Sequence, residues 1–294
     1  MGSILVTGGS GQLATALAAL GGARIKLVGR PEFDFDHPET IAATFQTAAP
    51  GLVVNAAAYT AVDAAEADHA AAFRANRDGP AELARLCAAA GIPLIHVSTD
   101  YVYDGKKPSP YVETDPVGPQ GVYGASKLAG ETAVLASGAR AIILRTAWVY
   151  AATGRNFVRT MLTLGQTRDS LRVVADQHGC PTAAADLAQA ILAIAAQIDV
   201  HGWNDPWSGV FHAAGSGETT WHGLAVAVFE EASRHGATVP ASVAAIATAD
   251  YPTPARRPAN SRLDCGRLEA VFGIRLPHWR DSLTRTIEQI FATS

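Results

Sequence analysis

The sequence predicts an α/β protein, a Rossmann-type doubly wound parallel sheet with a smaller lobe built from discontinuous C-terminal segments. Short apolar runs alternate with helical stretches throughout the first half of the chain. That alternation is typical of βαβ units and of a parallel sheet covered by helices on both faces. A glycine-rich turn follows the first apolar run and precedes a helical stretch, which is the pattern that opens many such sheets. After residue 148 the alternation loosens, and this change indicates a second, smaller unit.

The strands of the first half are short apolar runs, as expected of strands buried in a parallel sheet. The helix that follows the third strand should break near Gly79-Pro80, because proline removes a backbone donor from a helix interior. The expected strands are residues 4–7, 25–28, 52–55, 94–98 and 141–145, and the expected helices are residues 12–20, 40–48, 64–90 and 123–135.

The second half has fewer regular patterns, and some of its segments are expected to return to the large sheet. Its expected elements are helices at 156–164, 185–198, 220–235, 265–272 and 279–291, strands at 171–174 and 210–213, and a proline-rich loop at 249–260. We expect residues 1–150 to form a dinucleotide-binding domain to which residues 182–215 return. Residues 151–181 and 216–294 are then expected to form a substrate-binding lobe.

The composition argues against several classes of protein. Of the 294 residues 48% are hydrophobic, the net charge is −4, and no lysine- or arginine-rich run occurs, so no nucleic-acid surface is expected. The three cysteines lie far apart without the spacing of a metal site, which suits a reducing cytosol. No secretory leader is evident, and no apolar run approaches the ~18 residues of a membrane helix. We therefore expect a cytoplasmic protein with no membrane partner.

The glycine-rich turn VTGGSGQLA joins the first strand to the first helix. Gly8, Gly11 and Ala14 are small enough for a tight turn, for close approach of the backbone to a pyrophosphate and for close helix–strand packing. The helix N-terminus adds free N–H groups and the positive end of the helix dipole. The spacing GxxGxxA differs from the GxGxxG of many dehydrogenases and points to the short-chain reductases. An ordinary glycine turn is the alternative.

Arg30 comes directly after the second strand, where the adenosine ribose of a dinucleotide is recognised. An acid at this position would bond the 2′-hydroxyl of NAD, whereas an arginine accommodates the 2′-phosphate of NADP. Arg30 therefore favours NADP(H), with NAD(H) still usable, and a solvated arginine without this role is the alternative. Asp34 and Phe35, a few residues further on, are expected near the adenine.

Small and hydroxyl-bearing residues follow the third and fourth strands. Asn55 and three alanines end the third strand, where small side chains let a cofactor cross the strand end. The loop 59–63 then lies at the edge where open α/β sheets bind their ligands. Thr99 ends the fourth strand, where its hydroxyl can bond a substrate carbonyl oxygen. For Thr99, a turn residue at a strand end is the alternative.

Tyr123 and Lys127 in VYGASKLAGE are four residues apart and share one helix face. A lysine charge beside the phenol favours the phenolate and can lower its pKa by about 1–3 units. A free tyrosine titrates at about 10, so the lower pKa makes Tyr123 a useful proton donor near neutral pH. Such pairs also occur by chance on surface helices. Together with Thr99 and the glycine turn, the pair predicts hydride transfer between a nicotinamide cofactor and a carbonyl carbon.

Beyond these single motifs, the chain resembles the dTDP-4-dehydrorhamnose reductases, a family of extended short-chain reductases, almost from end to end. The likeness is carried by the strings TGGSGQL, NAAAYTAVDAAE, STDYVYDG, VYGASKLAGE, RTAWVYAATGRNF, DQHGCPT, TTWHGLA, YPTPARRPANSRL and FGIRLPHWRDSL. The resemblance implies NADPH-dependent reduction of the 4-keto group of dTDP-4-dehydro-β-L-rhamnose. The product, dTDP-β-L-rhamnose, completes dTDP-L-rhamnose biosynthesis and serves cell-surface polysaccharides. The implied partner is thus a dTDP-linked 4-keto-6-deoxy sugar.

The resemblance also implies roles for individual residues. Tyr123 matches the catalytic tyrosine, Lys127 the lysine that also holds the nicotinamide ribose, and Thr99 the hydroxyl. Asn156 and the loop 256–260 of the second lobe are expected to bind dTDP, with Arg256 or Arg257 at the pyrophosphate as a planar fork. The positions that match the cofactor cradle are Gly11, Gln12, Leu13, Asp34, Phe35, Ala58, Tyr59 and Thr60, and those around the deoxysugar are Val62, Asp100, Tyr101 and Trp148. For Trp148, simple core packing is the alternative.

One departure from the family concerns metal. Some members bridge a dimer through Mg²⁺ held by glutamates, whereas the matching positions here are Ala16, Ala185 and Gln289. None of these is the hard anionic ligand that Mg²⁺ prefers, and the histidines do not pair at ligand spacing. Both the metal and that dimer are therefore in doubt for this chain. No metal ligand is assigned, and a monomer or a homodimer is expected.

Other functions stay open on the sequence alone. A sister reductase that makes another 6-deoxyhexose would share every residue named above. A regulatory subunit that binds the cofactor without turnover is disfavoured because Thr99, Tyr123 and Lys127 are all intact. An epimerase or a dehydratase of the same group would use similar residues. A dehydratase would carry an acid and a base carboxylate beside the threonine, whereas here Asp100 is followed by Tyr101.

Overall fold

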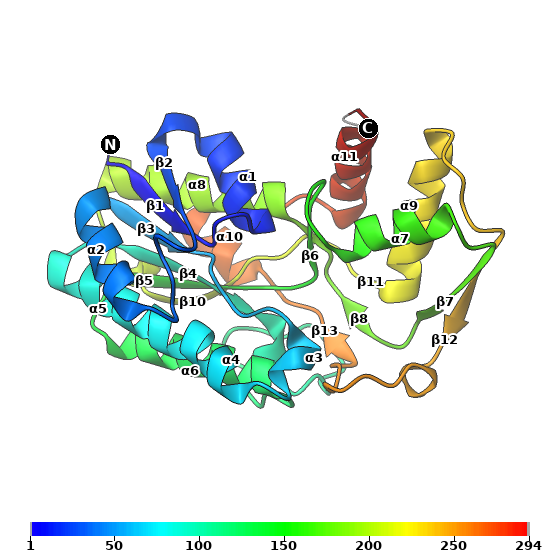
Figure 1. Ribbon diagram of the computed structural model, residues 1–294, viewed down its shortest axis with the longest axis horizontal. Helices are drawn as coiled ribbons and strands as arrows, with labels where there is room; N and C mark the ends of the chain where they lie inside the picture. The colour runs from blue at the N-terminus through cyan, green and yellow to red at the C-terminus, as the bar shows by residue number, and fades with distance from the viewer. Residues whose placement is uncertain (1, 293–294) are drawn as a thin grey trace.

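The computed structural model describes residues 2–292, which form a large sheet with helices on both faces and a smaller lobe beside it (Figure 1). All six strands of the large sheet are parallel, in the order β10-β5-β4-β3-β1-β2. The chain order reverses beside β1, which confirms the predicted doubly wound sheet. The strands are β1 Ile4–Thr7, β2 Ile25–Val28, β3 Leu52–Asn55, β4 Leu94–Thr99, β5 Ala141–Thr146 and β10 Gly209–His212.

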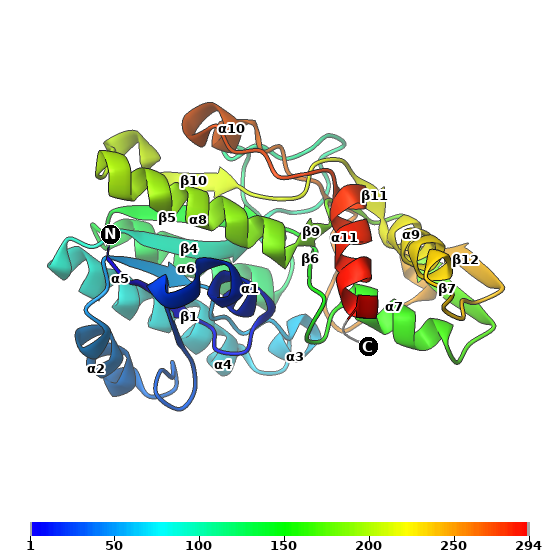
Figure 2. The same cartoon turned by 90° about the horizontal axis from the view of Figure 1, so that it is seen from above.

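Helices cover both faces of this sheet. Ile4 and Val6 are buried against one helical layer and Leu5 against the other, because successive side chains of a strand point to opposite faces. On the first face α1 and α8 lie side by side (Figure 2), with α10 near β10; α2, α5 and α6 cover the second. Their bounds are α1 Gln12–Gly21, α8 Ala184–His201, α10 Gly266–Phe272, α2 Pro38–Ala48, α5 Gly79–Ala90 and α6 Val122–Ala136.

The helical region after β3 differs from the prediction of one helix broken near Gly79-Pro80. The chain forms α3 (Val62–Ala65) and α4 (His69–Phe73), then a π-helical turn over Arg74–Asp78 that runs directly into α5. The predicted break at the proline is therefore wrong, and the interruption lies at residues 66–68. Pro80 has no N–H to donate to the carbonyl four residues earlier. The wider π turn, whose hydrogen bonds span five residues, accommodates this missing bond.

The smaller lobe has its own apolar core, in which Val158, Leu224, Val228 and Leu283 are buried together. Strands β7 and β12 form a parallel pair on one side of it, and β8 joins β11 and β13 in a short three-stranded sheet. The elements of this lobe are α7 Phe157–Gly165, β7 Ser170–Val174, β8 His178–Gly179, β11 Thr219–Thr220, α9 Trp221–Arg234, β12 Ser242–Ile246, β13 Asn260–Ser261 and α11 Trp279–Ala292.

Two short strands lie where the chain passes between the sheet and the smaller lobe. They are β6 (Val149–Tyr150) and β9 (Thr182–Ala183), which pair in parallel. Single 3₁₀ turns complete the chain at Gly22–Arg24, Asp100–Val102, Asp205–Trp207 and Thr248–Asp250. Among residues 2–292, no helix combines the length and the apolar character that crossing a membrane requires.

Candidate active site

A cleft of about 1120 Å³ runs along the carboxyl ends of the parallel strands, between the large sheet and the smaller lobe. This is the edge where open α/β sheets bind ligands. The cleft brings together most of the residues predicted from the sequence. Those that line it are Gly8, Gly11, Gln12, Leu13, Arg30, Phe35, Ala58, Tyr59, Thr60, Val62, Thr99, Asp100, Tyr101, Tyr123, Lys127 and Trp148.

At one end of the cleft the glycine turn forms a cradle that larger residues would fill. Gly8 has a φ of 111°, and a Cβ there would lie 3.1 Å from the backbone of Ala56. A Cβ on Gly29 would lie 2.7 Å from the Cα of Gly9, so two backbone segments touch at this point. Gly11 is the N-cap of α1 and makes no side-chain cap, which leaves the first N–H groups of the helix free for an anion. The cradle fits the pyrophosphate of a dinucleotide.

Arg30 lies at the open edge of this end, and its side chain is 66% exposed. Its guanidinium donates to Asp34 at 2.9 Å and to Asp36 at 2.6 Å, and Asp36 also accepts from Arg74 at 2.6 Å. Burial opposes ionisation of Asp34, yet hydrogen bonds from the Asp36 N–H and from Arg30 lower its pKa below the ordinary value. A 2′-phosphate at Arg30 therefore has to share the guanidinium with two carboxylates.

Tyr123 lies in the first turn of α6, next to the end of β4. Glu66 fixes the start of this helix, because its Oε1 accepts a hydrogen bond of 2.8 Å from the N–H of Val122. The Tyr123 and Tyr101 rings meet edge to face, with centroids 5.5 Å apart. Burial raises the pKa of Tyr123 above its ordinary value, whereas the Thr99 hydroxyl acts in the opposite direction. The phenol is therefore held in its protonated form.

Lys127 is only 2% exposed, and its ammonium donates to the carbonyl of Val97 at 2.7 Å. On its other side, Nζ lies 3.5 Å from Nε2 of His96. Burial lowers the pKa of Lys127 to about 8, although the charge of Glu131 works against this shift. In this structure the lysine is therefore held against β4, and its acidifying effect on Tyr123 stays a prediction.

The tautomer of His96 follows from the hydrogen bonds behind it. Asn55 Oδ1 accepts from Thr7 Oγ1 at 2.6 Å and from the N–H of Ala57 at 3.3 Å. The Asn55 amide nitrogen therefore points to His96 Nδ1, at 3.0 Å. Burial holds the pKa of His96 well below its ordinary value, so the ring is neutral, accepts at Nδ1 and carries its proton on Nε2. This N–H faces the nitrogen of Lys127 at 3.5 Å.

Thr99 and Asp100 lie together at the end of β4. Thr99 Oγ1 donates to Asp100 Oδ1 at 3.1 Å and accepts from the N–H of Tyr101 at 3.2 Å. Burial raises the pKa of Asp100 to about 6, although the hydroxyls of Ser261 and Thr99 favour its ionised form. Thr99 is thus both a strand-end cap and a hydroxyl that lines the cleft.

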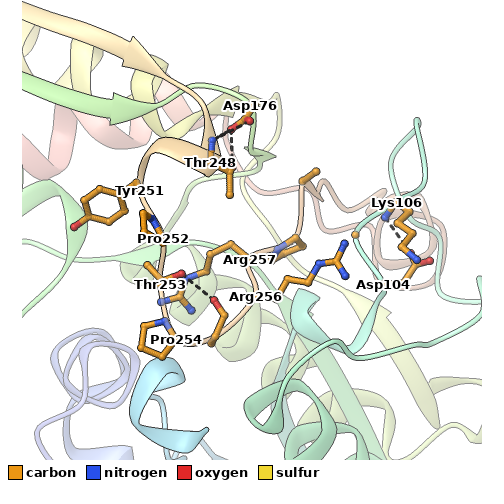
Figure 3. Close-up of a pocket in the computed structure, with 14 residues that line it drawn as sticks. Asp104, Lys106, Asp176, Thr248, Tyr251, Pro252, Thr253, Pro254, Arg256 and Arg257 are labelled. Carbon is orange, nitrogen blue, oxygen red and sulfur yellow. Dashed lines mark hydrogen bonds between the residues drawn. The ribbon is translucent and has the colours of Figure 1, made fainter.

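A second, smaller pocket of about 490 Å³ adjoins the loop between β12 and β13 (Figure 3). Arg256 and Arg257 line it, together with Asp104, Asp176 and Thr248. The predicted substrate residue Arg257 lies here and not in the large cleft, with its Nη2 2.6 Å from the Oδ2 of Asp63. This ion pair joins the smaller lobe to α3. We call this the side pocket.

Two other predicted residues lie beside the cleft and not in its lining. Asn156 caps α7 by accepting from the N–H of Arg159 at 3.1 Å, and its amide donates to Gln12 Oε1 at 2.9 Å. Asp34 lies behind Arg30, as described above. Of the positions that the family uses for Mg²⁺, Ala185 and Gln289 are exposed and Ala16 is half-buried. Within residues 2–292 no group of three or more His, Cys, Asp or Glu side chains is placed to hold a metal ion.

Three residues of the site were not singled out in the sequence. His96 lies behind Lys127, and Trp221, the first residue of α9, lines the cleft. Asn76, in the π-helical turn, accepts from Tyr59 N at 2.8 Å and donates to Ser126 Oγ at 2.9 Å. It thereby ties the cofactor loop to α6. None of these contacts has a signal in a short stretch of sequence.

The fold and this residue set together define a reductase of the short-chain type, with a dinucleotide cradle and a Thr-Tyr-Lys set in one cleft. More narrowly, the chain belongs to the RmlD substrate binding domain family, whose family model matches residues 2–291.

Named relatives and solved structures agree with this assignment. A dTDP-4-dehydrorhamnose reductase of Sinorhizobium fredii is 48% identical over 287 residues, covering 97% of this chain and 96% of the relative. That of Escherichia coli is 40% identical over 303 residues, covering 99% of each. The dTDP-4-dehydrorhamnose reductase structure from Clostridium acetobutylicum has a TM-score of 0.88 at 35% identity, covering 98% of this chain and 99% of its own. The Bacillus anthracis structure, in complex with NADP, gives 0.88 at 30% identity with the same coverage.

Proposed function

We propose that this protein is a dTDP-4-dehydrorhamnose reductase, which uses NADPH to reduce the 4-keto group of dTDP-4-dehydro-β-L-rhamnose to dTDP-β-L-rhamnose. The observation that carries the proposal is that Thr99, Tyr123 and Lys127 line the same cleft as the glycine cradle. Family membership over residues 2–291 supports the narrower choice of substrate.

The reaction adds a hydride to C4 of the sugar and a proton to its oxygen. NADPH, when bound, supplies the hydride. Tyr123 donates the proton to the developing alkoxide as a general acid, and the Thr99 hydroxyl bonds the same oxygen and orients it. Lys127 holds the nicotinamide ribose and supplies positive charge near the phenol. The carbonyl is thereby converted to a hydroxyl, with one proton consumed for each NADPH oxidised.

The cofactor occupies the end of the cleft that the glycine turn forms. The N-terminus of α1 and the glycine backbone bind the pyrophosphate, and Arg30 meets the 2′-phosphate of NADPH. Because Arg30 is also bonded to Asp34 and Asp36, NADH is a usable second cofactor. The other contacts come from Gly8, Gly11, Gln12, Leu13, Phe35, Ala58, Tyr59 and Thr60.

The sugar nucleotide occupies the end of the cleft beneath the smaller lobe. Val62, Asp100, Tyr101 and Trp148 surround the deoxysugar. Arg257 lies in the side pocket, paired with Asp63, and would have to leave this ion pair to meet the diphosphate as a planar fork. Asn156 supports this side through its bond to Gln12. Residues 1–150 with 182–215 thus bind the cofactor, and residues 151–181 with 216–294 bind the substrate. The enzyme works in the cytoplasm as a monomer or homodimer without a metal ion.

The direct test is to mix the enzyme with NADPH and dTDP-4-dehydro-β-L-rhamnose, follow absorbance of the reduced cofactor, and identify the product. We expect NADPH oxidation and dTDP-L-rhamnose in equal amounts. A different 6-deoxyhexose would identify a sister reductase. No oxidation by a protein that binds NADPH would contradict catalysis and favour a regulatory cofactor-binding role.

A further inference from the structure

A stack of aromatic rings forms the wall of the cleft where the large sheet meets the smaller lobe. The rings of Trp148 and Trp221 lie parallel, with centroids 3.6 Å apart and planes at 10°. Phe157 packs against Trp221 at 4.7 Å. Trp148 follows β5 of the large sheet, Trp221 begins α9 of the smaller lobe, and both line the cleft. The stack therefore joins the two lobes at the site itself.

Trp148 adopts a backbone conformation that needs support from its surroundings. Its φ is 49°, in the left-handed region that a bulky residue rarely enters. Such strain persists only where neighbouring contacts over-determine it, and it is common at ligand sites. The backbone of Gly179 lies against the ring, because a Cβ there would be 2.4 Å from Cε2 of Trp148. Gly179 and Trp221 are thus two contacts that hold the ring in place.

The polar edge of Trp221 is fixed by a chain of hydrogen bonds. Its indole N–H donates to Gln177 Oε1 at 3.1 Å, and Gln177 Nε2 donates to Thr248 Oγ1 at 3.0 Å. Thr248 in turn donates to Asp176 at 2.6 Å, as Figure 3 shows at the rim of the side pocket. Gln177 is buried, Thr248 is half-buried and Asp176 is exposed, so this chain runs from the interior to the surface. It connects the stacked rings of the cleft to the side pocket.

We propose that Trp221 is a positioning residue, which sets the orientation of the Trp148 ring against the sugar and couples that ring to the side pocket. The proposal rests on the proposed function, since Trp148 contacts a sugar only if the cleft receives one. Trp221 acts through Trp148 and does not take part in proton or hydride transfer. Its loss should therefore weaken binding of the sugar nucleotide and leave cofactor binding unchanged.

The test compares two variants of Trp221 with a matched control. Trp221→Leu removes the ring, Trp221→Phe keeps a ring but cannot donate to Gln177, and Trp203→Leu removes a tryptophan that packs on Trp207 outside the cleft. From the strength of an aromatic pair, we expect Trp221→Leu to raise KM for the sugar nucleotide about threefold to tenfold. The rise in Trp221→Phe should be smaller, and the dissociation constant for NADPH should match that of Trp203→Leu.

A spectroscopic signature separates positioning from general destabilisation. Two stacked indoles couple their electronic transitions and give a paired positive and negative band in circular dichroism. We expect Trp221→Leu and Trp221→Phe to lose the part of the couplet that comes from the Trp148–Trp221 stack, whereas Trp203→Leu should lose only the contribution of the Trp203–Trp207 pair. Gly179→Ala, which displaces the Trp148 ring while Trp221 is intact, should raise KM for the sugar nucleotide in the same way. An unchanged KM in both Trp221→Leu and Gly179→Ala would overturn the proposal.

Two further outcomes are decisive. If Trp221→Leu weakens NADPH binding as much as sugar-nucleotide binding, the residue is structural and the proposal is wrong. If the wild-type protein reduces no sugar nucleotide, the proposed function is wrong, and the couplet alone then tests the role of Trp221. A couplet that keeps its full amplitude in Trp221→Leu would show that Trp148 has no stacked partner there, because the Trp203–Trp207 pair would then account for all of it.

Discussion

The two ends of the cleft contain basic residues in opposite surroundings. Lys127, at the end where Tyr123 lies, is 2% exposed and has a carbonyl and a neutral imidazole as neighbours. Arg30, at the end that the glycine turn forms, is 66% exposed and has two carboxylates as neighbours. Water screens the charge of Arg30, whereas little screens that of Lys127.

This contrast predicts which of the two residues has the stronger effect on the reaction. A buried charge shifts its own pKa and those around it, and burial lowers the pKa of Lys127 to about 8 although the charge of Glu131 works against this shift. An exposed ion pair contributes little, because solvent and long side chains weaken it. We therefore expect large effects on catalysis from changes at the buried end and small effects on cofactor choice from changes at the open end.

The largest effect is expected from Tyr123→Phe. Phenylalanine keeps the ring against Tyr101 but cannot donate a proton, and general acid catalysis typically contributes ~10²–10⁴-fold. We expect kcat to fall by about that factor while NADPH binding is almost unchanged. Steady-state kinetics and a fluorescence titration with NADPH measure both quantities. A variant that keeps more than about half of the wild-type kcat, far outside that range, would show that another group is the acid.

The buried end should also determine how activity depends on pH. The Lys127 ammonium is present below its pKa of about 8 and is lost as the pH rises through that value. We expect kcat/KM to fall above this pH by about tenfold per pH unit. Lys127→Arg keeps its charge throughout this range, so its profile should lack that limb, whatever its overall rate. A wild-type profile that stays flat to high pH would contradict the assignment.

A smaller effect is expected at the open end. We expect the wild type to prefer NADPH over NADH about tenfold, because Arg30 makes a charge-assisted contact with the 2′-phosphate and solvent exposure weakens that contact. Arg30→Ala should remove this preference. The change should appear in KM for NADPH, because the contact is the same in ground and transition states. Asp36→Asn is the matched variant: it frees Arg30 from one carboxylate and should strengthen the preference. If both variants and the wild type use the two cofactors equally, Arg30 is a solvated arginine without this role.

No effect is expected from a chelator. Ala16, Ala185 and Gln289 offer no carboxylate to a hard cation such as Mg²⁺. Activity measured in excess EDTA should equal activity with added Mg²⁺. If EDTA abolishes activity and Mg²⁺ restores it, other residues bind a metal. The charges at the two ends of the cleft would then not be sufficient to explain the activity.

The regular parts of the fold follow from local patterns, and for that reason the sequence predicts them well. The helix predicted at 12–20 is Gln12–Gly21, and the strand predicted at 94–98 is Leu94–Thr99. Strand β12 (Ser242–Ile246) was missed because it is mostly exposed and lacks a continuous apolar run. Pairing with β7, which is distant in the sequence, stabilises this strand. The π-helical turn was missed for a similar reason, since contacts with Tyr59 and α6 stabilise it.

The residues of the candidate site also fall into two groups, those that local sequence patterns predict and those that depend on contacts distant in the chain. The glycine turn, Thr99, Tyr123 and Lys127 were found because spacing along one strand or helix determines their relative positions. Trp221 was not found, because only packing between the lobes turns the first ring of α9 into the cleft. The sequence also did not predict that Arg257 would lie in the side pocket, paired with Asp63. Contacts between residues distant in the chain carry no local pattern.

The central claim is that the cleft transfers a hydride to C4 of the sugar. The most direct measurement uses NADPH with deuterium at the transferred position, together with dTDP-4-dehydro-β-L-rhamnose. Proton and deuterium NMR of the product then locate the label. The account predicts that the wild-type product carries a single deuterium at C4 of dTDP-L-rhamnose. Tyr123→Phe, incubated for the same time, should form no labelled product. A product without deuterium at C4, or with the label at another carbon, would contradict it.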